Sequence, residues 1–84
     1  MSGKKTRRAW AEAYGVPYGV MAEALRDYAF RERLPRGLSG EMFDGETVQN
    51  ALVQYYAAKR DRRMREAYYY NQIINDIRDR GILD

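Results

Sequence analysis

The stretch "AYGVPYGVMAEAL", residues Ala13 to Leu25, places two glycines and a proline between two alanine-rich segments. Gly15 stands where a left-handed glycine would end a helix that begins after Thr6, a good N-cap. Pro17 fits the first turn of a second helix, where its missing N–H costs nothing. The stretch therefore predicts two helices joined by a tight turn, either as a helix-turn-helix or as a simple helical hairpin.

The second helix is expected to bury one face. Its apolar residues have the spacing i, i+3, i+4 and i+7 of a core-facing stripe: Met21, Ala24, Leu25 and Tyr28. The helix is expected to end near Arg33, because Pro35 disfavours the helical conformation for the residue before it. The small Ala11 lets the two helices approach, so that the stripe packs under Trp10.

The next segment, "LPRGLSGEMFDGE" from Leu34 to Glu46, holds three glycines and a proline and is therefore not helical. We expect a short β-hairpin here, two brief strands around Ser39–Gly40. Asp44 is then expected to cap a third helix that begins near Gly45.

Residues 46–80 contain neither proline nor glycine, so they form one long helix or two. Apolar residues continue at helical spacing along this stretch: Val53, Tyr56, Ala67, Tyr70, Ile74 and Ile77. The stripe passes through Arg60 and Arg63, which cannot belong to a dry core. Either the helix leaves the domain there, or the chain bends near residues 59–63. Gly81 is expected to end the last helix, with Ile82 and Leu83 folding back on it.

The 84 residues suffice for one small domain. The chain has no cysteine and no histidine, and so lacks a thiol nucleophile, the commonest general base and the usual transition-metal ligands. The acidic residues Glu41, Asp44 and Glu46 lie together at an expected helix start, where helix capping accounts for them and no catalytic role is needed. We expect a soluble, intracellular protein that is not an enzyme and has no metal, cofactor or small-molecule substrate. No apolar run approaches the roughly 20 residues that span a bilayer, so no membrane partner is expected.

The net charge of +3 is unevenly distributed. One basic cluster lies near the N-terminus: Lys4, Lys5, Arg7 and Arg8. A second cluster, diluted by two acids, follows in the C-terminal half: Lys59, Arg60, Arg62, Arg63 and Arg65. Two basic clusters suit a polyanionic partner, because phosphate contacts supply most non-specific affinity for nucleic acid. Ordinary solvated helix faces are the alternative.

The order of residues after the bend resembles the small winged helix-turn-helix proteins of the excisionase and MerR-like class, over about residues 8–56. The matching residues are Leu34, Pro35, Gly37, Gly40, Phe43, Glu46, Val48 and Leu52. The resemblance implies a winged helix-turn-helix in which the short β-hairpin is the wing. Together with the helical stretch 46–80, it predicts a mainly α fold with a long C-terminal helix in one or two segments. In this class the second helix enters the major groove and the wing touches the backbone or minor groove, which makes Arg36 the wing contact. Glu41 departs from the pattern, because a basic residue is usual after the wing glycine.

The outward face of the second helix offers little for reading bases. None of its first outward positions (Pro17, Tyr18, Gly19, Ala22 and Glu23) is an arginine, lysine, asparagine or glutamine, the side chains that pair with purine edges. Tyr18 can touch a thymine methyl group, Glu23 can accept from cytosine, and Arg26 can read a base or the backbone. We therefore expect double-stranded DNA to be held mainly through phosphates and shape. The expected contacts are Lys4, Lys5, Arg7, Arg8, Tyr18, Glu23, Arg26 and Arg36.

Tyr68, Tyr69 and Tyr70 point to three helix faces and cannot form one stacking platform. A stripe on the last helix is expected to form a homo-oligomer or partner interface, with ordinary core packing as the alternative: Ala67, Tyr70, Ile74 and Ile77. The chain is thus divided into a flexible basic arm (1–5), a winged helix-turn-helix-like domain (6–58) and a C-terminal extension (59–84).

Two functions stay open, together with RNA binding as a third. The first is a DNA-binding regulator or architectural factor of phage or mobile-element type, in the cytoplasm of a bacterial or phage-infected host cell. The second is a non-enzymatic protein-binding module, such as an assembly subunit or a phage anti-defence inhibitor, which uses the Tyr/Arg-rich helix.

Overall fold

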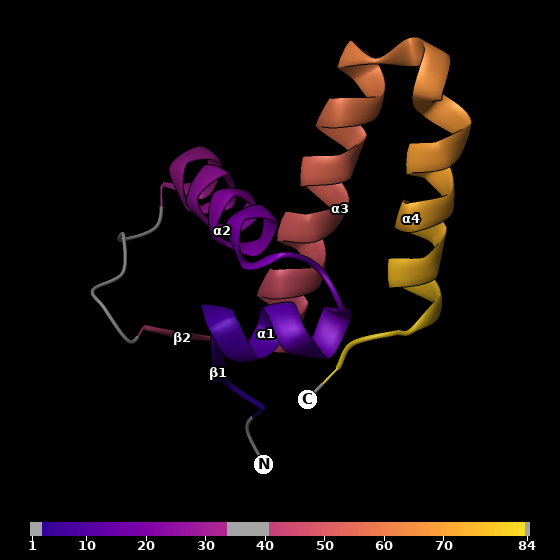
Figure 1. The fold of residues 1–84 in the computed structure, drawn as a ribbon. Coiled ribbons are helices and arrows are strands. Elements are labelled where there is room, and N and C mark those ends of the chain that lie inside the picture. Colours follow the sequence, from indigo (N-terminus) through magenta and orange to yellow (C-terminus); the bar gives the residue numbers. More distant parts are fainter. Residues whose placement is uncertain (1–2, 34–40, 84) are drawn as a thin grey trace.

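The computed structural model describes residues 3–33 and 41–83. Within them the fold is mainly helical, with one small antiparallel sheet (Figure 1). The elements are, in order, β1 (Lys5–Thr6), α1 (Arg7–Tyr14), α2 (Tyr18–Glu32), β2 (Met42–Phe43), α3 (Gly45–Arg62) and α4 (Ala67–Asp79). Helices α3 and α4 lie side by side as an antiparallel hairpin, α2 packs against α3, and α1 packs against α2 (Figure 1). No helix in the described ranges combines the length and apolar character needed to cross a membrane.

The bend between α1 and α2 forms as predicted. The Thr6 hydroxyl accepts a hydrogen bond from the Ala9 N–H at 3.3 Å and caps α1. Gly15 ends α1 with φ of 69°, a left-handed conformation that favours glycine. Pro17 is the N-cap of α2 and not part of its first turn, with extended backbone angles that lead the chain into the helix. These local signals place α2 across α1.

The core lies where the two N-terminal helices meet α3. Its largest fully buried side chains are Trp10, Met21, Leu52 and Val48. The predicted stripe of α2 is confirmed, since Met21, Ala24 and Leu25 are buried and Tyr28 packs against them. Trp10 also donates a hydrogen bond from Nε1 to the Phe43 carbonyl at 2.7 Å, which ties α1 to β2.

The small sheet includes Lys5, the last residue of the expected flexible arm (1–5). Lys5 pairs with Phe43 and Thr6 with Met42 in an antiparallel ladder. The Lys5 ammonium also lies 4.8 Å from the centre of the Trp10 ring, so Lys5 is held by both its backbone and its side chain. The hairpin expected around Ser39–Gly40 lies outside the described residues. The partner that the structure shows for β2 is the N-terminal strand.

The C-terminal half consists of two helices, which decides between the alternatives left open above. Asp44 caps α3 as predicted, accepting from the Thr47 N–H at 2.7 Å. The chain leaves the helical conformation at Arg63 and makes a 3₁₀ turn at Met64–Glu66 before α4 begins. It therefore bends and returns along α3 instead of leaving the domain.

The return of α4 corrects the expected partner interface. Ile74 and Ile77 are each only 4% exposed and belong to the molecule's own core. Tyr70 packs against that core, and Ala67 is half-buried. Helix α4 therefore packs on α3, and its apolar stripe is covered within the molecule.

The end of the last helix follows the prediction in part. Gly81 follows α4 with φ of 71°. Its N–H donates to the Arg78 carbonyl at 3.0 Å. Leu83 then packs against the core, as expected. Ile82 stays more than half exposed.

Candidate functional site

The N-terminus of α2 is open to an incoming anion. Pro17, its N-cap, supplies no side-chain acceptor, and the first hydrogen bond of the helix runs from the Met21 N–H to the Pro17 carbonyl. The N–H groups of the first turn therefore have no partner within the helix. A Cβ added at Gly19 would meet no described atom within 4 Å, so a ligand can approach the backbone closely. By contrast, side chains cap α1 and α3.

One basic side chain, Arg8, lies beside this helix start. The Arg8 guanidinium carbon is 4.6 Å from the centre of the Tyr18 ring, which brings an exposed cation of α1 onto the first residue of α2. Arg7, at the start of α1, is half-buried. The structure thus joins Arg8 and Tyr18, two residues that the sequence predicted as DNA contacts from separate helices.

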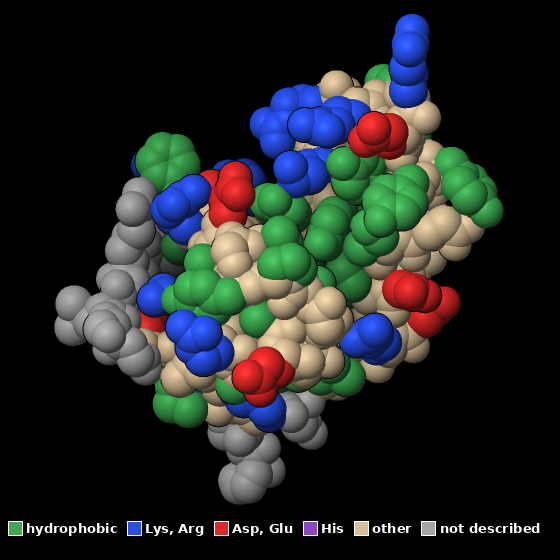
Figure 2. All heavy atoms as spheres, in the orientation of Figure 1, with side chains coloured by type: hydrophobic (Ala, Val, Ile, Leu, Met, Phe, Trp, Pro, Cys, Tyr) green, Lys and Arg blue, Asp and Glu red, His purple; other side chains and the backbone are tan. Residues whose placement is uncertain are grey.

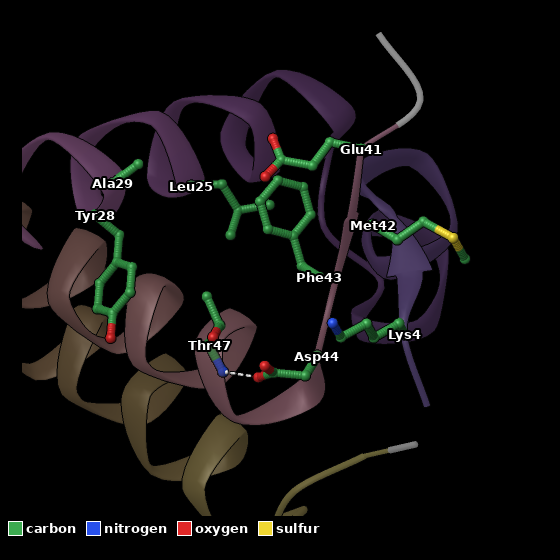
Figure 3. Close-up of a pocket in the computed structure, with 9 residues that line it drawn as sticks. All are labelled: Lys4, Leu25, Tyr28, Ala29, Glu41, Met42, Phe43, Asp44 and Thr47. Atoms are coloured by element: carbon green, nitrogen blue, oxygen red, sulfur yellow. Dashed lines mark hydrogen bonds between the residues drawn. The ribbon is translucent and has the colours of Figure 1, made fainter. Parts of the chain in front are cut away.

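Lys4 lies on another side of the small sheet, near Asp44. The pKa of the Asp44 carboxyl is lowered, chiefly by the hydrogen bond from the Thr47 N–H and to a smaller extent by the charge of Lys4. Figure 3 shows the Lys4 ammonium directed toward Asp44. Lys4 is therefore drawn toward the start of α3 instead of the start of α2.

Further along α2 the exposed face has mixed charge. Glu23 and Arg26 are both exposed. Arg26 Nε lies 4.0 Å from a carboxylate oxygen of Asp27. Arg26 follows Tyr18 by two helical turns, or about 12 Å along the axis. Arg36, the predicted wing contact, lies outside the described residues.

The second basic cluster occupies the opposite end of α3, at the bend into α4. We call residues 59–69 the corner; Figure 2 shows Lys and Arg side chains gathered over it. Helix α3 runs about 27 Å from β2 to the bend, and the cluster lies on its last turn and just beyond it. Arg60 donates to the Asn71 side-chain oxygen at 2.9 Å and so joins α3 to α4. Lys59 lies 5.3 Å from the centre of the Tyr55 ring. The two basic clusters are therefore separate surfaces.

Sequence reasoning missed two features of the surface. One is that both Tyr68 and Tyr69 are exposed at the corner, together with Met64; the sequence had indicated partial exposure of only one of the two tyrosines. The other is a cavity of about 210 Å³ between α2, β2 and the start of α3, which brings together distant segments (Figure 3).

The cavity has an apolar floor and a charged rim. Leu25, Tyr28 and Phe43 line it, and Lys4 and Glu41 stand at its edge (Figure 3). One Glu41 carboxylate oxygen is buried with no hydrogen-bond partner among the described residues. In the same ranges no three acidic side chains group as a metal site would require. The opposite charges of the rim favour no single ligand class.

Comparisons with protein-family models, with curated proteins and with solved structures gave no match. The resemblance to the excisionase and MerR-like class therefore stays a prediction carried by the residues quoted above.

Proposed function

We propose that this chain is a small protein that binds double-stranded DNA, with α1, the turn and α2 acting as a helix-turn-helix. The open N-terminus of α2 beside Arg8 carries the proposal. A helix N-terminus offers free N–H groups and partial positive charge to a phosphate. The Arg8 guanidinium adds a charge-assisted hydrogen bond to the same anion.

Binding of this kind depends on the backbone and shape of DNA more than on its bases. Glu23 on the exposed face of α2 repels phosphates, and Arg26 is close to the carboxylate of Asp27. In this proposal β1 and β2 form the base of the wing, with Arg36 as its contact. The function is then that of an architectural factor or a regulator with weak sequence preference.

The test replaces Pro17 with aspartate. An N-cap aspartate stabilises a helix by about 1 kcal/mol, which offsets the roughly 0.4–1 kcal/mol lost with proline. P17D should therefore melt close to the wild-type temperature. Its carboxylate would occupy the phosphate position, so affinity for a fluorescein-labelled duplex at low salt should fall. The matched control, P17N, caps the helix without the charge and should lose less affinity.

A second variant tests the cation. R8A should bind the duplex more weakly, with a log–log salt dependence shallower by about 0.9, as expected when one phosphate is no longer neutralised. Equal affinities for P17D and P17N would contradict the proposal. So would the absence of wild-type binding to any duplex at low salt. A stoichiometric protein partner recovered without nucleic acid would then favour the protein-binding module instead.

A further inference from the structure

The corner between α3 and α4 exposes large side chains that the fold does not use. Tyr68 is 77% exposed, Tyr69 65% and Met64 70%. Figure 2 shows hydrophobic side chains beside the basic cluster at this end of the molecule. The corner lies where α3 leads into α4, whereas the proposed duplex contact is formed by α1 and the start of α2, so different residues carry the two proposals.

Tyr69 is held in place by other aromatic rings. Its ring meets Tyr70 edge-on, with centres 5.7 Å apart. Tyr70 lies 6.3 Å from Tyr56, which in turn meets the buried Tyr55 at 5.2 Å. The four rings lead from the core to the surface, so Tyr69 is an exposed ring whose orientation is already set. Binding to it therefore requires little further ordering of the side chain.

Two arginines of the corner have guanidinium groups that are available to bind an anion. Arg60 is engaged by Asp61 and Asn71, and Arg63 lies 4.0 Å from Glu66. Arg62 and Arg65 are exposed, and their guanidinium groups have no ion pair or hydrogen bond to any described residue. Arg65 lies in the 3₁₀ turn directly before α4, four residues before Tyr69.

We propose that the corner binds single-stranded nucleic acid, with a base stacked on Tyr69 and phosphates paired with Arg62 and Arg65. Aromatic rings combined with basic side chains are the usual means of holding an unpaired strand without sequence preference. A duplex does not fit this surface in the same way, because its base faces are already stacked on one another.

A protein partner fits the corner less well. The centre of a protein interface is depleted in charged residues. Here the exposed rings stand among arginines and Glu66, and the outward face of α4 continues with polar residues: Asn71, Gln72 and Asn75. Isolated rings among cations suit bases and phosphates, which do not require a continuous apolar patch.

The test measures binding of a fluorescein-labelled oligothymidylate of about 12 nucleotides by fluorescence anisotropy. Y69A should weaken binding about tenfold, within the range for removal of one stacking ring. Y69F keeps the ring and should keep the affinity. Y68A should lose less, because Tyr68 has no ring contact with another described residue. Changing both Arg62 and Arg65 to alanine should make the log–log salt dependence shallower by about 0.7 for each phosphate that is no longer paired.

The matched control is F30A, which removes an equally exposed ring, 72% exposed, from α2. It should leave affinity for the oligothymidylate unchanged. Y69A should melt a few degrees lower, because it loses the ring contact with Tyr70, but should keep the fold and the duplex affinity of the wild type. The unchanged duplex affinity separates this inference from the proposed function. Unchanged oligothymidylate affinity in Y69A, or a larger loss in Y68A than in Y69A, would overturn the inference. If Y69A binds normally and a polyglutamate peptide displaces the oligothymidylate, the corner is a surface for acidic proteins and the inference is wrong.

Discussion

Replacing Gly45 with alanine should detach the C-terminal tail from the start of α3. Gly45 is the buried first residue of that helix. A Cβ at this position would overlap the Leu83 carbonyl oxygen and would lie 3.2 Å from Ile82 Cγ2. Because the obstacle is backbone and not the far end of a flexible side chain, the tail itself has to move.

Two opposing effects set the magnitude. Alanine is favoured over glycine in a helix by about 0.5–1 kcal/mol. Displacement of the tail removes part of the burial of Leu83, about 1 kcal/mol for a half-buried leucine. It also breaks the 3.1 Å hydrogen bond from the Gln49 amide to the Gly81 carbonyl, worth about 1 kcal/mol. In the full chain, G45A should therefore lower the free energy of unfolding by about 1 kcal/mol.

The same substitution should have the opposite sign in a chain that ends at Gly81. Without Leu83 there is nothing to displace, and the helix preference of alanine should raise stability by about 0.5 kcal/mol. Urea denaturation of the wild type, G45A, the shortened chain and the double variant gives a complete thermodynamic cycle. If G45A destabilises the shortened chain as much as the full one, the tail is not the obstacle and the reasoning is refuted.

Three further changes test contacts that shape the sheet and the helix starts. Because the pKa of Asp44 lies below its ordinary 3.8, its contribution to stability is present above that pH and is lost as the pH falls through the folded-state pKa. D44A should accordingly lower the free energy of unfolding by about 1 kcal/mol at pH 7, and thermal denaturation at acidic pH should show a smaller difference from the wild type. A difference that does not change with pH would exclude the hydrogen bond to the Thr47 N–H as its cause. W10F should lower the free energy of unfolding by about 2 kcal/mol, because it leaves the Phe43 carbonyl without its donor and opens a small space; full stability in urea would argue against this hydrogen bond. T6A should cost about 1 kcal/mol, whereas T6S should keep the α1 cap and most of the stability in thermal melts.

Two helix starts and one helix end could be predicted from the sequence, because the residues that cap a helix act within one turn. Thr6 and Asp44 reach N–H groups three residues ahead, and Gly15 needs only its own backbone conformation. The apolar stripe of α2 was equally readable, since helical spacing alone puts Met21 and Leu25 on one face.

The candidate site was predicted in its parts but not in its assembly. Arg8 and Tyr18 were both named as DNA contacts, yet their stacking depends on the angle at which α2 crosses α1. The open start of α2 could have been predicted from two residues. Pro17 offers no side-chain capping group, and Gly19 has no side chain to cover the backbone. The row of tyrosine rings that orients Tyr69 could not have been predicted from the sequence, because it joins residues of two helices that run in opposite directions.

By itself, the sequence determined where α1, α2 and α3 begin and where α1 and α2 end, because caps, glycines and spacing act over a few neighbouring residues; the break between α3 and α4 it left open. Only the tertiary structure decided that Lys5 belongs to a strand, since its partner Phe43 is far along the chain. Tertiary packing likewise turned Ile74 and Ile77 inward onto α3 and left Tyr69 outside. The reason is that an apolar stripe indicates which side chains must be buried, but not which surface will cover them. The covering surface depends on how the whole chain packs.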